Sequence, residues 1–145
     1  ALRASTAELE SRKHIFYEKY TKQLQIESEQ MVLLGRQYIL HAALEQQAAL
    51  AETVTKTEAA GVDASGLKSA LTDFAETVNA FRMSIDRLDN ADDKQDEDPV
   101  KQAKYIVSTI LPIMAECREL GDRLETMVSA DLWPLPSYRE MLFIR

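Results

Sequence analysis

The chain has 145 residues, of which 46% are hydrophobic and 28% charged, with a formal net charge of −7. This is the composition of a folded domain with its own core, so disorder throughout the chain is excluded. The negative charge argues against nucleic acid and anionic membrane surfaces as partners, because both require clustered Lys and Arg. The sequence contains no run of 18 apolar residues, so we predict no membrane-spanning segment. The first residues also lack the apolar core of a secretory signal. The single cysteine, Cys117, cannot form an internal disulfide, and we expect a reducing, cytoplasmic setting.

A first, very long helix is predicted from about residue 7 to residue 60. Ser5 followed by Glu8 has the spacing of a capping box, and Gly61 is a natural stop. Two apolar stripes run along its middle, which predicts burial on two sides. One stripe contains Met31, Leu34, Tyr38 and Ala42, and the other contains Ile26, Leu33, Leu40 and Leu44.

Two further helices are predicted at about residues 64–88, capped by Asp63, and at about 99–130, capped by Asp98. The second helix has an unbroken heptad stripe: Leu67, Leu71, Phe74, Val78, Phe81, Ile85 and Leu88. The third continues the alternation through Val100, Ala103, Val107, Ile110, Met114, Cys117, Gly121, Leu124 and Val128. Pro112 lies in its interior and should kink it.

These elements predict an all-α fold: one domain over residues 1–145, a long antiparallel three-helix bundle or coiled coil. The second and third helices cover only about half of the first, by their lengths at about 1.5 Å per residue. Part of the first helix should therefore project, bend back or pack on something outside the chain.

An acidic loop is predicted at residues 89–98, with six acids against one lysine. A calcium-binding loop is one interpretation, but Lys94 stands where such a loop needs glycine, and Ala91 where it needs an oxygen ligand. A solvated linker is the preferred interpretation.

The sequence shows no catalytic or metal-binding motif. The pairs His41 with Glu45 and Glu10 with His14 do not have the order or spacing of a di-iron bundle. The four glycines are isolated, so there is no phosphate-binding loop. We predict no catalytic residue, no metal and no cofactor in this chain.

The tail, residues 131–145, reads DLWPLPSYREMLFIR. Its prolines predict an extended strap followed by a short final helix from Tyr138 to Phe143. The strap either covers the end of its own bundle, burying Trp133, Leu135 and Phe143, or clamps onto another body or subunit. The candidate interaction residues are Trp133, Pro134, Leu135, Pro136, Tyr138, Leu142 and Phe143 in the tail, with Met31, Leu34 and Tyr38 on the first helix.

Three stretches, in order, resemble the C-terminal helical region of type III glutamine synthetases. They are ELESRKHIFYEKYTKQLQIESE at 8–29, RQYILHAALEQQAALAETV at 36–54 with GVDAS at 61–65, and DLWPLPSYREMLF at 131–143. The sequence departs from that family at His41, where proline is usual, and at Arg139 and Glu140.

The resemblance implies a parent enzyme that makes glutamine from glutamate and ammonia with ATP and Mg²⁺ or Mn²⁺, assembled as large double rings. It implies a catalytic domain upstream of this region, and none of the catalytic motifs occurs here. The chain is then a non-catalytic domain with a packing, oligomerisation or regulatory role. Its partners would be the catalytic domain and neighbouring subunits of a homo-oligomer. Two alternatives remain: a free-standing helical protein–protein interaction module, and an enzyme or metal protein built inside a bundle.

Overall fold

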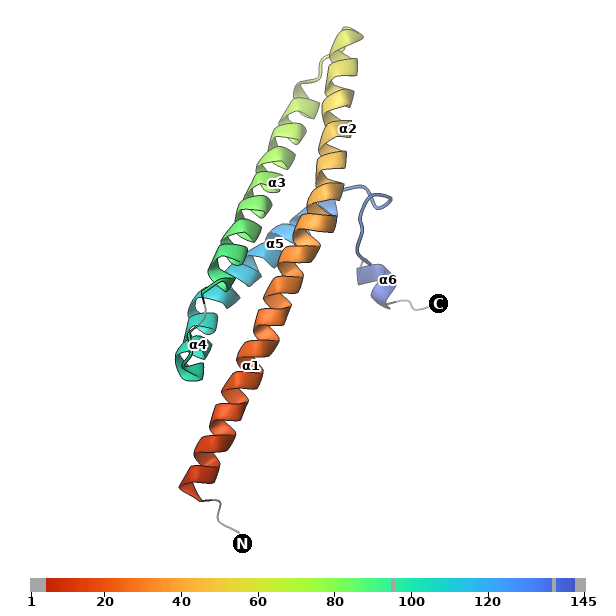
Figure 1. Ribbon diagram of the computed structural model, residues 1–145. Coiled ribbons are helices and arrows are strands. Elements are labelled where there is room, and N and C mark those ends of the chain that lie inside the picture. Colours follow the sequence, from red (N-terminus) through yellow and green to blue (C-terminus); the bar gives the residue numbers. More distant parts are fainter. Residues whose placement is uncertain (1–4, 95, 137, 143–145) are drawn as a thin grey trace.

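The computed structural model describes residues 5–94, 96–136 and 138–142, and every regular element in these residues is a helix (Figure 1). The predicted all-α fold is therefore confirmed.

The first long helix consists of α1 (Thr6–Leu34), a π-helical turn η1 (Gly35–Ile39) and α2 (Leu40–Ala59). Ser5 caps it, since its hydroxyl accepts a hydrogen bond from the Glu8 N–H at 3.2 Å. At the other end Gly61 adopts φ +76°, a conformation that only glycine takes without strain. The helix thus begins and ends within a residue of the prediction, but the widened turn at Gly35 was not expected.

Helix α3 (Ser65–Asp92) continues past the predicted end at residue 88. Residues 89–92, expected as loop, are helical. Arg36 of η1 explains this extension, because its guanidinium binds both Asp86 at 2.9 Å and Asp89 at 2.7 Å. At the start of the helix, Asp63 accepts hydrogen bonds from the backbone N–H and hydroxyl of Ser65.

The third helical arm consists of α4 (Pro99–Tyr105), a second π-helical turn η2 (Ile106–Ile110) and α5 (Leu111–Met127). Asp98 caps it by accepting from the Val100 N–H at 2.9 Å. The widened turn η2 comes directly before Pro112, which has no N–H to donate and whose ring crowds the preceding turn.

Two predictions for this third arm are wrong. Ile106, not Val107, faces the core: Ile106 is buried and Val107 is 53% exposed. The helix also ends at Met127 rather than near residue 130, because Val128 turns to extended backbone and is itself buried. The Ser129 N–H then donates to the Gln46 side chain of α2 at 3.2 Å, which fixes the chain beside the first helix.

The helices lie side by side over only part of their lengths (Figure 1). α2 and α3 form an antiparallel hairpin, α4 packs beside α1, and α5 runs back diagonally across the pair formed by α1 and α3. The first buried residue of α1 is Thr21. Residues 6–20 project beyond the rest of the described chain, and the apolar side chains of Leu9, Ile15, Phe16 and Tyr20 are exposed there.

Phe81 of α3 is the point where the three arms meet. Its ring is buried between two glycines, Gly35 of η1 and Gly121 of α5. A Cβ atom at Gly35 would lie 2.7 Å from Ile85 Cδ1 and 3.4 Å from the Phe81 ring, and one at Gly121 would lie 3.6 Å from that ring. Gly35 thus lets the first arm approach α3 more closely than a side chain would allow, whereas a Cβ at Gly121 would make an ordinary van der Waals contact.

The face that the first helix buries lies between the two predicted stripes. It contains Thr21, Ser28, Val32, Gly35, Ile39 and Ala43, which were not predicted as one stripe. Of the predicted residues, Ala42 is buried and Met31 and Leu40 are half-buried. Ile26, Leu33, Leu34, Tyr38 and Leu44 are 37–59% exposed. The expectation that both stripes are buried within this chain is therefore wrong.

Gly35→Ala should lower the free energy of unfolding by about 1–3 kcal/mol, because the new Cβ overpacks the core at Ile85. Urea denaturation measures this. Adding Ile85→Val removes Cδ1 and relieves the clash, so the double variant should lose less unfolding free energy than the sum of the losses in the two single variants.

Gly66→Ala is the control, since its Cβ would meet no atom within 4 Å. A helical alanine there should stabilise the fold by about 0.5–1 kcal/mol. Equal effects at the two glycines would contradict the packing described.

Asp92→Asn should raise the melting temperature at pH 7. Burial raises the pKa of the Asp92 carboxyl, the Ser28 hydroxyl opposes the rise, and the charges of Glu29 and Asp89 add to it. Folding therefore favours the protonated acid, and the cost of the ionised form is present at neutral pH and disappears as the pH falls below the ordinary value of 3.8. Thermal melts from pH 7 to 3 measure this.

Asp93→Asn is the matched control for this change. It removes the same charge at the same helix end from an exposed side chain, and because the Asp93 charge itself adds to the raised pKa of Asp92, we expect a smaller gain from it. An equal gain from both variants would show that the helix end, and not the burial of Asp92, is responsible.

Candidate interaction groove

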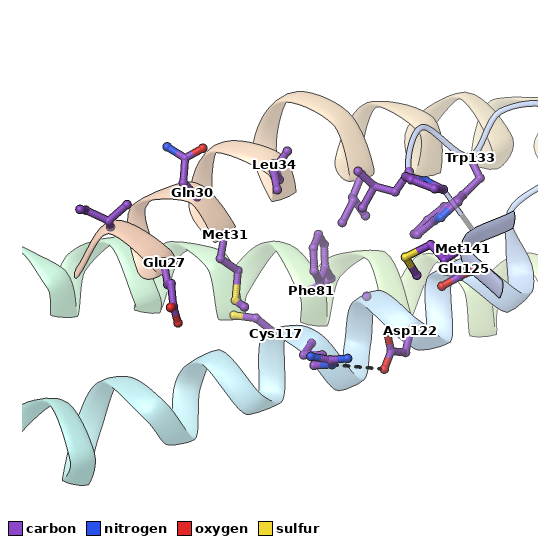
Figure 2. A pocket seen from close by; sticks show the side chains of 16 residues that line it. Glu27, Gln30, Met31, Leu34, Phe81, Cys117, Asp122, Glu125, Trp133 and Met141 are labelled. Atoms are coloured by element: carbon purple, nitrogen blue, oxygen red, sulfur yellow. Dashed lines mark ion pairs between the residues drawn. The ribbon is translucent and has the colours of Figure 1, made fainter. Parts of the chain in front are cut away.

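An open apolar groove of about 450 Å³ lies between α1, α5 and the tail (Figure 2). Phe81, the residue at which the arms meet, forms part of its floor together with Met31, Leu34, Ile39, Cys117 and Gly121. Figure 2 shows the Met31 side chain pointing toward Cys117, and both side chains line the groove. Gly121 and Phe81 both line the groove, and no side chain of Gly121 stands between α5 and the Phe81 ring.

The tail forms one wall of this groove. The chain turns sharply after α5, since the N–H groups of Leu132 and Trp133 both donate to the Ser129 carbonyl at 3.0 Å. The prolines that follow hold the backbone extended. Trp133 and Leu135 are half-buried and pack against the core, and Pro136 and Met141 extend the wall.

The rim of the groove carries more acids than bases. Glu27 of α1 and Asp122 and Glu125 of α5 stand around the opening, with Arg118 as the base. Arg118 lies 4.0 Å from Asp122, so one of these acids is already paired. An apolar segment that enters the groove would meet a net negative edge.

The Cys117 thiol is buried within the core, and burial raises its pKa. A protonated, buried thiol is a poor nucleophile. Cys117 therefore acts as a small apolar side chain here, as the sequence indicated.

The structure brings half of the predicted interaction residues together at this groove. Met31, Leu34, Trp133, Leu135 and Pro136 all line it. Pro134 is exposed, Tyr38 is 47% exposed and does not line the groove, and Leu142, at the end of α6 (Tyr138–Leu142), is 77% exposed. The side chain of Tyr138 and the whole of Phe143 lie outside the described residues, so burial of Phe143 stays a prediction. That these residues bind a partner also stays a prediction.

Sequence reasoning missed Ile26, Phe81, Gly121 and Met141 as groove residues. Gly121 was counted as one more member of the heptad stripe of its helix. A signal for the groove was nevertheless present, because glycine is costly inside a helix and usually marks a close approach of another element.

The part of the chain that the structure describes contains no group of three or more His, Cys, Asp or Glu side chains able to hold a metal ion. His14 approaches Glu18 at 3.6 Å, and His41 is exposed. Among the described residues, no helix is long and apolar enough to cross a membrane.

Comparison with known proteins identifies the relatives of the chain. Residues 4–58, which include α1, η1 and nearly all of α2, match the family described as glutamine synthetase C-terminal domain. The chain is 31% identical over 150 aligned residues to the type-3 glutamine synthetase of Dictyostelium discoideum, an alignment that covers 97% of the chain and 20% of that protein. The predicted resemblance to type III glutamine synthetases is confirmed.

The glutamine synthetase of Bacteroides fragilis (strain YCH46) is 27% identical over 146 residues, again with 95% of the chain and 20% of the relative covered. The chain thus spans about one fifth of the length of these relatives. It is similar to the C-terminal domain of glutamine synthetases over residues 4–58, and the longer match to these two relatives includes the tail that forms one wall of the groove.

Trp133→Ala should lower the free energy of unfolding by about 2 kcal/mol, roughly half the cost expected for a fully buried aromatic side chain. Urea denaturation followed by circular dichroism measures it. Pro134→Ala, next to it but exposed, should change stability by less than about 0.5 kcal/mol. Unchanged stability in the Trp133 variant would mean that the tail does not close its own bundle and would favour the clamp onto another body.

Proposed function

We propose that the chain acts as a non-catalytic C-terminal helical domain of a type III glutamine synthetase-like enzyme. Its task there is to pack against the catalytic domain and against neighbouring subunits of a homo-oligomer. One observation carries this proposal. Almost the whole chain is similar to two glutamine synthetases, and it matches only 20% of the length of each of them. In such a setting the exposed apolar side chains of the first helix and the groove would be covered by other parts of the assembly.

The parent reaction under this proposal is the ATP-dependent ligation of ammonia to glutamate in the cytoplasm, with Mg²⁺ or Mn²⁺. These groups would act in the catalytic domain, and no residue of this chain is assigned to them. The chain contributes by holding subunits in position.

Packing is favoured here over the binding of a small regulatory molecule. The groove floor consists of apolar side chains, and its charged groups stand on the rim. A small-molecule site usually adds a few convergent polar groups that fix the orientation of the ligand. An apolar surface with a charged rim has instead the character of a protein–protein contact.

The second candidate is a free-standing helical interaction module. It is favoured by the compact core around Phe81, which this chain builds from its own three arms. In that case the projecting part of α1 and the groove would bind a different protein.

The full polypeptide in its source distinguishes the two candidates. An antibody against this chain should detect a product several times larger than the 16.4 kDa of these residues, and that product should form glutamine from glutamate, ammonia and ATP. Deleting the segment that corresponds to residues 5–142 should reduce the mass of the assembly. A product of 16.4 kDa, or a deletion that leaves the assembly intact, would contradict the proposal.

A further inference from the structure

One face of α1 carries a regular row of exposed side chains that borders the groove only at Ile26. We call it the outer stripe and define it by Ile15, Lys19, Lys22, Ile26, Glu29 and Leu33. The spacing is 4, 3, 4, 3 and 4 residues, which keeps all six on one side of a helix. All six are exposed, and the three apolar members are 59%, 59% and 40% exposed.

The outer stripe faces away from the core. The buried face of α1 contains Thr21, Ser28 and Val32. At about 100° per residue, the centre of the outer stripe lies about 120° around the helix from the centre of this buried face, with Glu29 as the member nearest to it. Nothing in the described part of the chain covers this face.

We propose that the outer stripe binds the same stripe of a second copy of this chain, with the two α1 helices antiparallel. Pairing them about a two-fold axis beside Leu24 places Ile15 opposite Leu33 of the second copy. The same register places Lys19 opposite Glu29 of the second copy and Lys22 opposite Ile26 of the second copy. Each of these contacts forms twice, because a two-fold axis repeats every contact.

The charged side chains of the stripe favour the antiparallel over the parallel direction of the two helices. In the antiparallel arrangement, each Lys19 ammonium meets a Glu29 carboxylate of the second copy, and the alkyl stem of Lys22 lies along Ile26 of the second copy. In a parallel arrangement, Lys19, Lys22 and Glu29 would each meet their own copy, and all three contacts would repel. The stripe is complementary to itself only when it is reversed.

The charged members of the stripe are available for this role. No ion pair within the described residues engages Lys19, Lys22 or Glu29, whereas Arg12 is held by Glu8 at 2.7 Å. Glu29 contributes a repulsive charge to Asp92 of the same chain, so an ammonium group brought up to Glu29 also relieves that repulsion.

The two bundles would not collide in this arrangement. Each core lies on the buried face of its own α1, about 120° around the helix from the outer stripe, so the two cores lie on the sides of the paired helices that face away from each other. The paired length from Ile15 to Leu33 is about 27 Å at 1.5 Å per residue. The pairing deepens the proposed function, on which it rests for its role in a larger assembly, by naming one subunit contact and its register.

Charge reversal tests the pairing. The proteins to compare are the wild-type chain, Lys19→Glu, Glu29→Lys and the double variant, by sedimentation equilibrium at low salt. Each single reversal creates two repulsive contacts and should weaken dimerisation about tenfold. The double reversal restores opposite charges and should return the affinity to within about twofold of wild type. Lys104→Glu, an exposed charge on α4, is the control and should have no effect.

An apolar variant separates this surface from the other exposed face of α1. Ile15→Asp should abolish the dimer, while Phe16→Asp, on the side of α1 that leads to the groove, should leave it intact. Circular dichroism should show unchanged helix content in all variants, since none of these side chains is buried.

A wild-type chain that stays monomeric would overturn the pairing. So would a double reversal as weak as the single ones, or a dimer that responds to Phe16→Asp and not to Ile15→Asp. None of these outcomes alters the mass or activity of the full polypeptide, so failure of the pairing is distinguishable from failure of the proposed function.

Discussion

The packing of Phe81 between Gly35 and Gly121 is the constraint on which the rest of the structure depends. Gly35 allows the closest approach, because a Cβ there would lie 2.7 Å from Ile85 Cδ1, whereas a Cβ at Gly121 would lie at an ordinary 3.6 Å from the Phe81 ring. Gly35 lies at the start of a widened turn and Gly121 in the middle of α5, so both arms meet α3 at the same level. The groove lies directly above this point, since Phe81 and Gly121 line it as well as belonging to the packed centre of the fold.

This arrangement also explains why so much of the first helix lacks a partner within the chain. α4 packs beside α1 and α5 then runs back across the hairpin, so neither extends along the projecting residues 6–20. The wide apolar surface of α1 is then covered only on the side that faces α3 and α4. Exposed apolar side chains at regular helical spacing are uncommon on a monomer and typical of a surface that meets another protein.

The sequence was sufficient to predict the elements of the fold that depend on local chemistry. Local chemistry explains where the helices begin and end: Ser5 and Asp98 cap the starts of two of them, and Gly61 stops the first. The heptad pattern of α3 likewise identifies the face of that helix that is buried in the core. The buried face of α1 could not be predicted, because its small and polar members, Thr21, Ser28 and Gly35, have no hydrophobic signature. The extension of α3 depends on Arg36, which lies fifty or more residues away. Five of the groove residues were predicted, three of them in the tail, and the other groove residues depend on which helices meet at Phe81.

Hydrogen exchange of the backbone amides tests most directly the claim that the chain is locked at Phe81 and leaves the start of α1 for a partner. In the dilute isolated chain, amides near Phe81 and Gly121 should exchange most slowly, and those of residues 9–20 should exchange fast, since an unsupported helix end is marginally stable. In the full assembled polypeptide, residues 9–20 should become protected. Equal protection of both regions in the isolated chain, or no gain on assembly, would contradict the account.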